Sequence, residues 1–264
     1  AGPATTWTAS DNLIGATDTN GTKVSATTSD TVDPQKPGTY NVRYTFTDST
    51  GSVITKTVVV TVKASQASVT ATDSVIKRGA TWQAADNLIS VVDAQGHPLS
   101  LTSAHVTTTG TVDSATPGTY HVTYHYTDVG GNVVTAQAAV VVTGVILKEN
   151  AKTIVTTSAW HPNDSIASAI GTTGADAIDA VNVAITNAVG ATVTSYTALG
   201  QYDVAYELNG QTTVLTLTVA SAAKITASDG AVILGSDWSA SDNLVAVVDE
   251  NGQNVDLTDA RITT

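Results

Sequence analysis

The sequence predicts an all-β protein made of small β-sandwich modules in tandem. Three observations support this prediction. The composition favours strands over helices, a tryptophan motif returns at intervals of 75 to 78 residues, and the segments between these motifs alternate between apolar and polar residues.

The composition also excludes several classes of protein. Only 3 of the 23 acidic residues are Glu, a helix former, whereas Thr and Val, which favour strands, are abundant. The 264-residue chain contains no Cys, so it cannot form disulfides or Cys-based metal or redox sites. Its 11 basic residues do not cluster and its net charge is −12, which argues against a nucleic-acid partner. No apolar run approaches the ~20 residues that would cross a membrane, so we expect no membrane insertion.

The first repeated block contains a tryptophan and an aspartate four residues later. Three copies read W-x-A-x-D-N-L, and the third copy in chain order changes to Trp160-His-Pro-Asn-Asp-Ser-Ile166. In the three copies that keep the W-x-A-x-D-N-L motif, a second Asp lies seven residues after the first, in a turn that ends with Gly. The tryptophans are Trp7, Trp82, Trp160 and Trp238, and the paired aspartates are Asp11 with Asp18, Asp86 with Asp93, and Asp242 with Asp249.

The second repeated block is a strand followed by a hairpin turn and a run of Val and Thr. Its aromatic and aliphatic residues occupy alternate positions from Tyr40, Tyr120 and Tyr202 onward, while the residues between them vary freely. An alternation with a period of two indicates a strand that is buried on one face. The Asp- or Asn-containing turns that follow predict antiparallel hairpins.

Together the two blocks predict three complete modules and the N-terminal part of a fourth. The expected boundaries are 1–66, 67–143, 144–221 and 222–264. The connecting segments are too short to be flexible tethers, so we expect the modules to stack as an elongated, semi-rigid rod that is part of a longer repeat array. The Ala-rich stretch 166–188 makes the third module divergent, and a part of residues 165–170 could form a short helical turn at the module edge.

Each tyrosine at the start of a penultimate strand lies where an immunoglobulin-like fold has its tyrosine corner. Its hydroxyl would bond back to the backbone of the preceding turn. The blocks Gly79 to Leu88, Pro117 to Tyr124 and Asp128 to Asn132 resemble the bacterial Ig-like modules (group 3 type) of surface proteins from lactobacilli, Listeria and related Gram-positive bacteria. The resemblance covers the first, second and fourth modules well and the third loosely.

The resemblance implies an extracellular protein, either on the bacterial surface or secreted. Such modules occur in adhesins and mucus-binding proteins, in S-layer-associated proteins and as accessory domains of secreted carbohydrate-active enzymes. It therefore implies a stalk or adhesion region with host mucin, matrix or glycans as partners. The alternatives are a spacer or weak glycan-binding region of a secreted carbohydrate-active enzyme, and modules that assemble an S-layer or fibre.

The recurring side chains allow both structural and functional interpretations. The four tryptophans could stack on sugars, but their recurrence in every copy favours a role as core or semi-buried anchors. The paired aspartates could bind Ca²⁺, but their spacing lacks the density of an EF-hand loop and favours turn and capping roles. We expect no enzymatic activity and no cofactor, because no acid, base or nucleophile stands apart from the repeat pattern.

Overall fold

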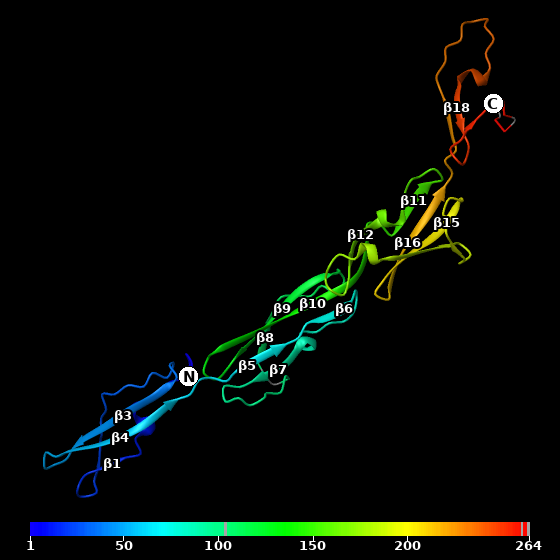
Figure 1. Cartoon of the computed structure of the whole chain (residues 1–264). Coiled ribbons are helices and arrows are strands. Elements are labelled where there is room, and N and C mark those ends of the chain that lie inside the picture. Colours follow the sequence, from blue (N-terminus) through cyan, green and yellow to red (C-terminus); the bar gives the residue numbers. More distant parts are fainter. Residues whose placement is uncertain (103–104, 260, 263–264) are drawn as a thin grey trace. The chain divides into compact units, whose positions relative to one another are not determined.

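The computed structural model describes residues 1–102, 105–259 and 261–262, and they form an all-β structure of Ig-like sandwich modules (Figure 1). The helical elements in this part of the chain are single 3-10 turns of three or four residues. Accordingly, none of the helices among the described residues is long and apolar enough to cross a membrane.

The chain divides into two compact units. Unit 1 comprises Ala1–Ser74, Trp82–Val112 and Tyr120–Val140, and unit 2 comprises Val75–Thr81, Asp113–Thr119 and Val141–Thr264. The hydrophobic clusters follow a finer division. One cluster draws on residues 7–62, another on residues 67–138, and a third on residues 145–219. The four-module division with boundaries at 66, 143 and 221 remains a prediction.

Unit 1 contains two repeats of the strand and turn pattern. In the first repeat the elements are η1 (Ala9–Asn12), β1 (Ala16–Thr17), β2 (Lys23–Val24), β3 (Gly38–Thr47) and β4 (Val53–Val62). In the second they are β5 (Ser68–Ala71), β6 (Ser74–Lys77), η2 (Ala84–Asn87), β7 (Leu88–Val92), β8 (Val106–Thr109), β9 (Gly118–Thr127) and β10 (Val133–Leu147), of which β6, β9 and β10 extend into unit 2.

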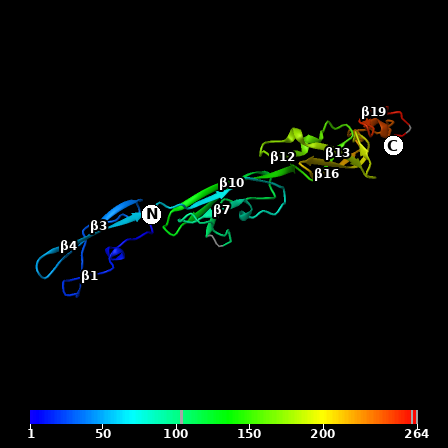
Figure 2. The same cartoon turned by 60° about the horizontal axis from the view of Figure 1, so that its bottom comes forward.

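Antiparallel pairs build both repeats of unit 1. Strands β3 and β4 pair over their whole length and lie side by side in both views (Figure 1 and Figure 2). In the second repeat, β9 lies between β8 and β10, and β5 pairs separately with β7. Side chains from both groups of strands, such as Val69, Val91 and Tyr124, share one buried cluster. This is the arrangement of a two-layer sandwich.

Unit 2 contains the largest hydrophobic cluster of the chain. Its further elements are β11 (Ala151–Val155), η3 (Pro162–Ser165), β12 (Ile166–Ile170), η4 (Ile178–Ala180), β13 (Asn182–Asn187), β14 (Thr192–Val193), β15 (Gly200–Leu208), β16 (Gln211–Ala220), β17 (Lys224–Ala227), η5 (Ala240–Asn243), β18 (Leu244–Val248) and β19 (Asn254–Val255).

Two groups of strands enclose this cluster. One sheet has the order β11-β16-β15-β13-β14, in which β11 and β16 are parallel. Facing it, the C-terminal part of β10 pairs with β12. Tyr202, Val204, Tyr206 and Leu208, at alternate positions of β15, are all buried. Further along the chain, β17, β18 and β19 form a separate three-stranded sheet.

The structure confirms the predicted strands and corrects one local expectation. The Tyr-containing segments form β3, β9 and β15, and the Val and Thr runs form β4, β10 and β16. The helical turn expected at residues 165–170 is wrong. Ile166–Ile170 is strand β12, and the 3-10 turn precedes it at Pro162–Ser165. The turn occupies the same place after Trp160 as in the other copies, and the strand pairs with β10.

A single turn type closes most of the hairpins. In this five-residue turn, the N–H of the first residue donates to the carbonyl of the fifth residue. The N–H of a Gly at the fourth position donates to the carbonyl of the first residue. That Gly has a positive φ, as at Gly21 (φ 78) and Gly96 (φ 88), which an L-residue rarely adopts. The third repeat keeps this turn although it lacks the Asp, because Gly171 takes the first position and Gly174 the fourth.

Candidate functional site

The repeated tryptophan motif forms the same capped 3-10 turn in all four copies. The Asp at the third position of each turn accepts a hydrogen bond from the backbone N–H three residues earlier. The pairs are Asp11 with Thr8 (2.8 Å), Asp86 with Gln83 (2.8 Å), Asp164 with His161 (2.8 Å) and Asp242 with Ser239 (2.9 Å). The backbone and hydroxyl hydrogen bonds from Thr8 lower the pKa of Asp11, which is the direction expected for a capping carboxylate.

The indole N–H of each tryptophan bonds to the last residue of the 3-10 turn that follows it in the chain. Trp82 Nε1–H donates to Asn87 Oδ1 at 2.7 Å. Trp7 and Trp238 make the same bond, each at 2.9 Å, to Asn12 and Asn243. In the divergent copy the acceptor is a hydroxyl, and Trp160 Nε1 lies 3.2 Å from Ser165 Oγ. The indole N–H is therefore used inside each repeat.

The same asparagine also holds an extended strand. Asn87 is fully buried, with an exposed fraction of 0%, and its Nδ2 donates to the carbonyl of Thr72 at 2.5 Å. Its own backbone carbonyl accepts the amide of Thr72 at 2.9 Å. Ser74 Oγ adds a hydrogen bond of 3.2 Å to Asn87 Oδ1. One side chain thus ties the indole, the strand that leads to Thr72, and the start of β6 together.

The divergent third copy replaces the amide with a short network. Ser165 Oγ donates to Glu149 Oε1 at 3.0 Å, and Lys152 Nζ lies 2.8 Å from the same oxygen. The hydrogen bonds from Lys152 and Ser165 lower the pKa of Glu149. Ser165 is itself buried. A hydroxyl and a carboxylate therefore occupy the place of the asparagine amide.

A second tyrosine in each complete repeat anchors the 3-10 turn from the opposite sheet. The hydroxyl donates to the carbonyl two residues after the tryptophan. The pairs are Tyr44 with Ala9 (2.7 Å), Tyr124 with Ala84 (2.6 Å) and Tyr206 with Pro162 (2.7 Å). Burial raises the pKa of Tyr206 to about 12, so its hydroxyl remains a donor at neutral pH.

The first tyrosine of the block makes the bond that a tyrosine corner requires. Tyr40 donates to the carbonyl of Lys36 at 2.9 Å, and Tyr202 donates to that of Ala198 at 2.8 Å. Both acceptors lie four residues upstream, in the turn that precedes the strand. Tyr120 occupies the equivalent place at the start of β9.

The second aspartate of each pair is a turn residue. Asp18, Asp93 and Asp249 each accept two backbone N–H groups on Oδ1, from the residues two and four positions on, at 2.8 to 2.9 Å. Within the described part of the chain, no group of three or more His, Asp or Glu side chains is placed to hold a metal ion. The six aspartates are therefore placed by turns and caps, and Ca²⁺ binding by them remains an untested alternative.

The tryptophans differ in burial. Trp160 is buried, with an exposed fraction of 8%, and Trp7 and Trp82 are half-buried against their clusters. Tyr196 meets Trp160 edge-on, with ring centroids 5.4 Å apart. The exposed fraction of Trp238 is 55%, and its role as an anchor stays a prediction. Among residues 222–259 and 261–262, no strand equivalent to β9 or β15 covers it.

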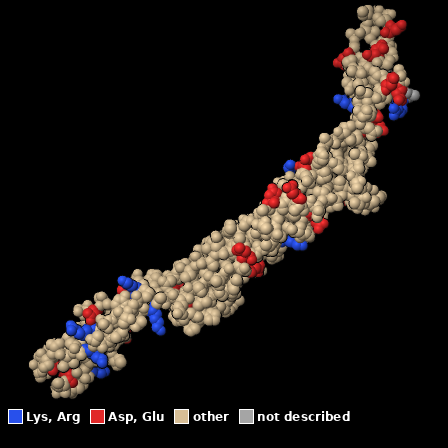
Figure 3. Space-filling view, in the orientation of Figure 1, with Lys and Arg blue, Asp and Glu red and all other residues tan. Residues whose placement is uncertain are grey.

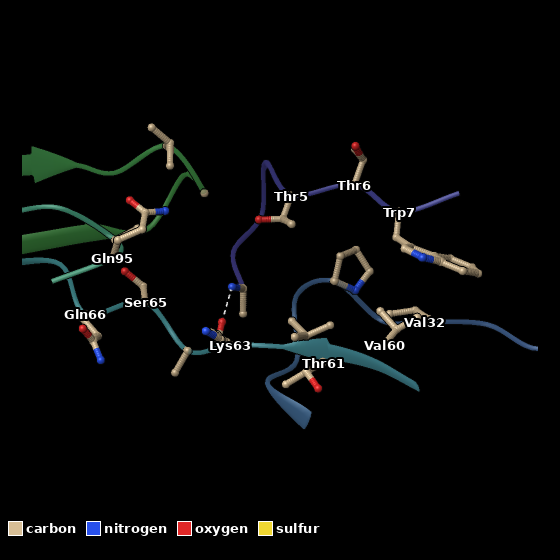
Figure 4. Close-up of a pocket in the computed structure, with 17 residues that line it drawn as sticks. Thr5, Thr6, Trp7, Val32, Val60, Thr61, Lys63, Ser65, Gln66 and Gln95 are labelled. Atoms are coloured by element: carbon tan, nitrogen blue, oxygen red, sulfur yellow. Dashed lines mark hydrogen bonds between the residues drawn. The ribbon is translucent and has the colours of Figure 1, made fainter. Parts of the chain in front are cut away.

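A cavity of about 660 Å³ in unit 1 lies beside Trp7 (Figure 4). At one end the indole of Trp7 lies near Val32 and Val60, and at the other the polar side chains of Gln66 and Gln95 gather. An apolar ring face combined with amide groups could contact a sugar.

Charge is sparse on the surface. On the face shown in Figure 3, acidic and basic side chains are scattered among a larger area of uncharged residues. This distribution offers no dense basic patch on that face, and it agrees with the low charged fraction of 13%. Most of the recurring aspartates serve the turns described above.

The sequence analysis identified the tryptophans and aspartates but missed two of the groups that connect them. These are the asparagine of the motif, with Ser165 in the third copy, and the second tyrosine of each block. The signal was present, because Asn12, Asn87 and Asn243 recur at the fifth position after Trp. The arrangement as a whole holds backbone segments of its own repeat together.

Part of the chain matches a known family. Residues 69–142 match the bacterial Ig-like domain (group 3). The match covers the second repeat, in agreement with the resemblance found in the sequence. No curated protein matches the chain significantly.

Several solved structures resemble the chain at low identity. The M60 catalytic domain with the CBM51-1 and CBM51-2 domains from Clostridium perfringens ZmpB is 12% identical over 65% of this chain and 20% of that one, with a TM-score of 0.26. The S-layer protein rSbsC(31-844) is 15% identical over 92% of this chain and 41% of that one, with a TM-score of 0.23. A tetra-tandem repeat from the extending region of a large adhesion protein is 14% identical over 80% and 67%, with a TM-score of 0.24. All three TM-scores are below 0.5, so these likenesses establish no function.

Replacing Asn87 with Ala should lower the free energy of unfolding of the second repeat by about 2 kcal/mol, because the change removes two part-buried hydrogen bonds of a fully buried amide, and one such bond contributes about 0.5–1.5 kcal/mol. The groups affected are the Trp82 indole N–H and the Thr72 carbonyl. Urea unfolding followed by tryptophan fluorescence measures the change. The matched control is Asn12→Ala, which removes an exposed side chain that bonds only to Trp7 and should cost less than about 1 kcal/mol. Equal losses in the two variants would contradict the assigned role of Asn87.

Proposed function

We propose that this chain is a non-catalytic region of a bacterial surface or secreted protein, where it acts as a stalk and contributes to the binding of host mucus, matrix or glycans. The observation that carries the proposal is the use of the recurring polar side chains. The asparagine amide, the aspartate carboxylates and the tyrosine hydroxyls bond to backbone groups of their own repeat, and the tryptophan N–H bonds to that asparagine. Such a design supports a mechanical role over a chemical one.

Hydrogen bonds at the predicted module boundaries support the stalk. Within unit 1, Ser65 Oγ donates to Asp128 Oδ2 at 2.5 Å, and Asn132 Nδ2 donates to the carbonyl of Ala1 at 2.8 Å. Burial alone would raise the pKa of Asp128, but the hydrogen bonds from Ser65, Asn132 and Gly130 outweigh it and lower the pKa. Asp128 is therefore ionised at neutral pH and remains an acceptor for Ser65.

Unit 2 contains a comparable set of contacts at the next predicted boundary. The side-chain amide of Gln211 bonds twice to the backbone of Arg78, accepting its N–H at 3.1 Å and donating to its carbonyl at 2.9 Å. The Arg78 guanidinium donates to the carbonyl of Val145 at 2.7 Å. Contacts of this kind restrict rotation at a boundary and favour a semi-rigid connection.

The cavity beside Trp7 favours a second candidate function. In this alternative the chain is a spacer or weak glycan-binding region of a secreted carbohydrate-active enzyme, with Trp7 stacking on a sugar ring. The assembly of an S-layer or fibre is a further alternative, in which the edge strands would join chains.

The stalk predicts an extended particle in solution. A compact chain of 264 residues has a radius of gyration of about 18 Å and an unfolded one about 57 Å. Small-angle X-ray scattering should give at least about 1.5 times the compact value, with the scattering profile of a folded rod. A value near the compact one would contradict the stalk. The variant Gln211→Ala should broaden the distance distribution, whereas Gln201→Ala, an exposed residue on β15, should leave it unchanged.

Glycan binding at the cavity is tested separately. If Trp7 stacks on a sugar, the full chain should bind immobilised mucin or an array of glycans in a saturable way, and Trp7→Ala should weaken this binding at least about tenfold, since stacking and desolvation together contribute over about 1 kcal/mol. Trp238→Ala is the matched control, because its exposed indole lies outside the cavity. Equal binding by both variants would exclude the cavity as the site. An absence of binding by the full chain would leave the stalk role alone.

A further inference from the structure

The division of the chain into two compact units does not follow the repeats. The segments Val75–Thr81 and Asp113–Thr119 belong to the second repeat by sequence, yet both lie in unit 2 with the third repeat. Strand β10 (Val133–Leu147) also serves both repeats, because it pairs with β9 of the second and, through its C-terminal part, with β12 of the third. One strand therefore contributes to two consecutive repeats.

The predicted boundary at residue 143 lies inside this strand and is buried. Six consecutive residues, 140–145, are buried. Successive side chains of a strand point to opposite faces, so β10 is covered on both faces where it passes from one repeat to the next. A buried and paired segment loses apolar contacts and hydrogen bonds when the structure on either side of it unfolds.

Gly144 is the point at which β10 crosses between the repeats. Its φ is 148°, in a region that L side chains rarely adopt. A Cβ on Gly144 would lie 3.1 Å from Arg78 Cβ, 3.3 Å from Gln211 Oε1 and 3.6 Å from Pro117 Cγ. Arg78 and Pro117 belong to the second repeat, and Gln211 belongs to the third. Both repeats therefore close on the backbone of this one residue.

Arg78 connects the two repeats through hydrogen bonds. Its N–H donates to the carbonyl of Thr143 at 2.8 Å and to Gln211 Oε1 at 3.1 Å. Its carbonyl accepts a hydrogen bond from Gln211 Nε2 at 2.9 Å. The guanidinium donates to the carbonyl of Val145 at 2.7 Å, on the third-repeat side of Gly144. Unfolding of the third repeat would remove these partners from a half-buried residue of the second.

A turn of the third repeat adds a steric contact in unit 2. The backbone of Gly174 lies so close to Thr119 that a Cβ on the glycine would meet the threonine hydroxyl, and this Cβ would lie 3.5 Å from Val141 Cγ2. Thr119 lies on β9 and Val141 on β10. The third repeat thus packs directly on the strands that close the second.

We propose that the second and third repeats form one cooperative unit, joined through β10 at Gly144, so that neither keeps its structure when the other unfolds. The inference deepens the proposed function, because its use to the protein rests on the stalk role. A stalk built in this way would resist bending and stretching at this joint. Between the first and second repeats, β4 ends at Val62 and β5 begins at Ser68, so no strand is shared there.

Urea unfolding of the full chain tests the coupling, with the indole N–H signals of the tryptophans followed by ¹⁵N NMR. Trp82 reports on the second repeat and Trp160 on the third. Asn87→Ala should lower the urea midpoint of both signals by about 1 M, and the two signals should share one m value, since m scales with the surface that a cooperative transition exposes. The Trp7 midpoint should shift less. An unchanged Trp160 midpoint in Asn87→Ala would overturn the proposal.

The variant Gly144→Ala tests the crossing point. It should separate the midpoints of Trp82 and Trp160 by at least about 0.5 M, because the added methyl group displaces Arg78 or Gln211. Gly200→Ala is the matched control, since Gly200 has a similar φ of 140° but nothing within 4 Å of the added Cβ. The control should lower both midpoints together. Separation in both variants, or in neither, would contradict the role of Gly144.

Force spectroscopy tests the coupling in the full chain without any substitution. Stretching from the two ends should release residues 67–220 in a single step of about 50 nm, because an extended chain spans about 3.4 Å per residue. Two separate steps of about 25 nm would overturn the cooperative unit. The extended shape measured by X-ray scattering is independent of either result, so failure of this inference is distinguishable from failure of the stalk.

Discussion

The structure of the second and third repeats depends on a buried polar group at the end of the tryptophan motif. In the second repeat this group is the Asn87 amide, which accepts the Trp82 indole N–H and donates to the carbonyl of Thr72, the residue after β5. A buried amide is expensive unless its donors and acceptors are paired, and here the pairing itself joins three segments that are distant in sequence. In the described chain no buried side-chain polar atom lacks a hydrogen-bond partner. In a small core without disulfides, such a connection helps to fix one arrangement of the segments around it.

The third repeat shows which part of this constraint can vary. Ser165 and Glu149 together replace the amide, and the indole still finds an acceptor. The tyrosine bond to the 3-10 turn is retained as well, from Tyr206 to the carbonyl of Pro162. The repeat therefore requires a hydrogen-bonded polar group that connects the 3-10 turn to the indole. Either an asparagine amide or a hydroxyl with a carboxylate can supply it. The same view accounts for Trp238, which keeps its bond to Asn243 but lacks a covering strand.

Much of this fold follows from the sequence alone, and the remainder has a physical reason. The alternation that starts at Tyr40, Tyr120 and Tyr202 predicts strands, and these segments form β3, β9 and β15. The bonds of Asn87 could not be derived in this way, because they join residues 72, 82 and 87 through an arrangement in space that spacing does not specify. The helical turn expected in a part of residues 165–170 does not extend past Ser165, because Ile166–Ile170 pairs with β10, and this pairing is not visible in the local sequence.

The most direct test of this account is hydrogen exchange at the four indole N–H groups, followed by ¹⁵N NMR of the intact chain. The account predicts slow exchange for Trp82 and Trp160, whose acceptors Asn87 and Ser165 are buried, and faster exchange for Trp7 and Trp238, whose acceptors are more exposed. Exchange at one common, fast rate for all four would contradict the claim that this buried polar connection holds the repeats together.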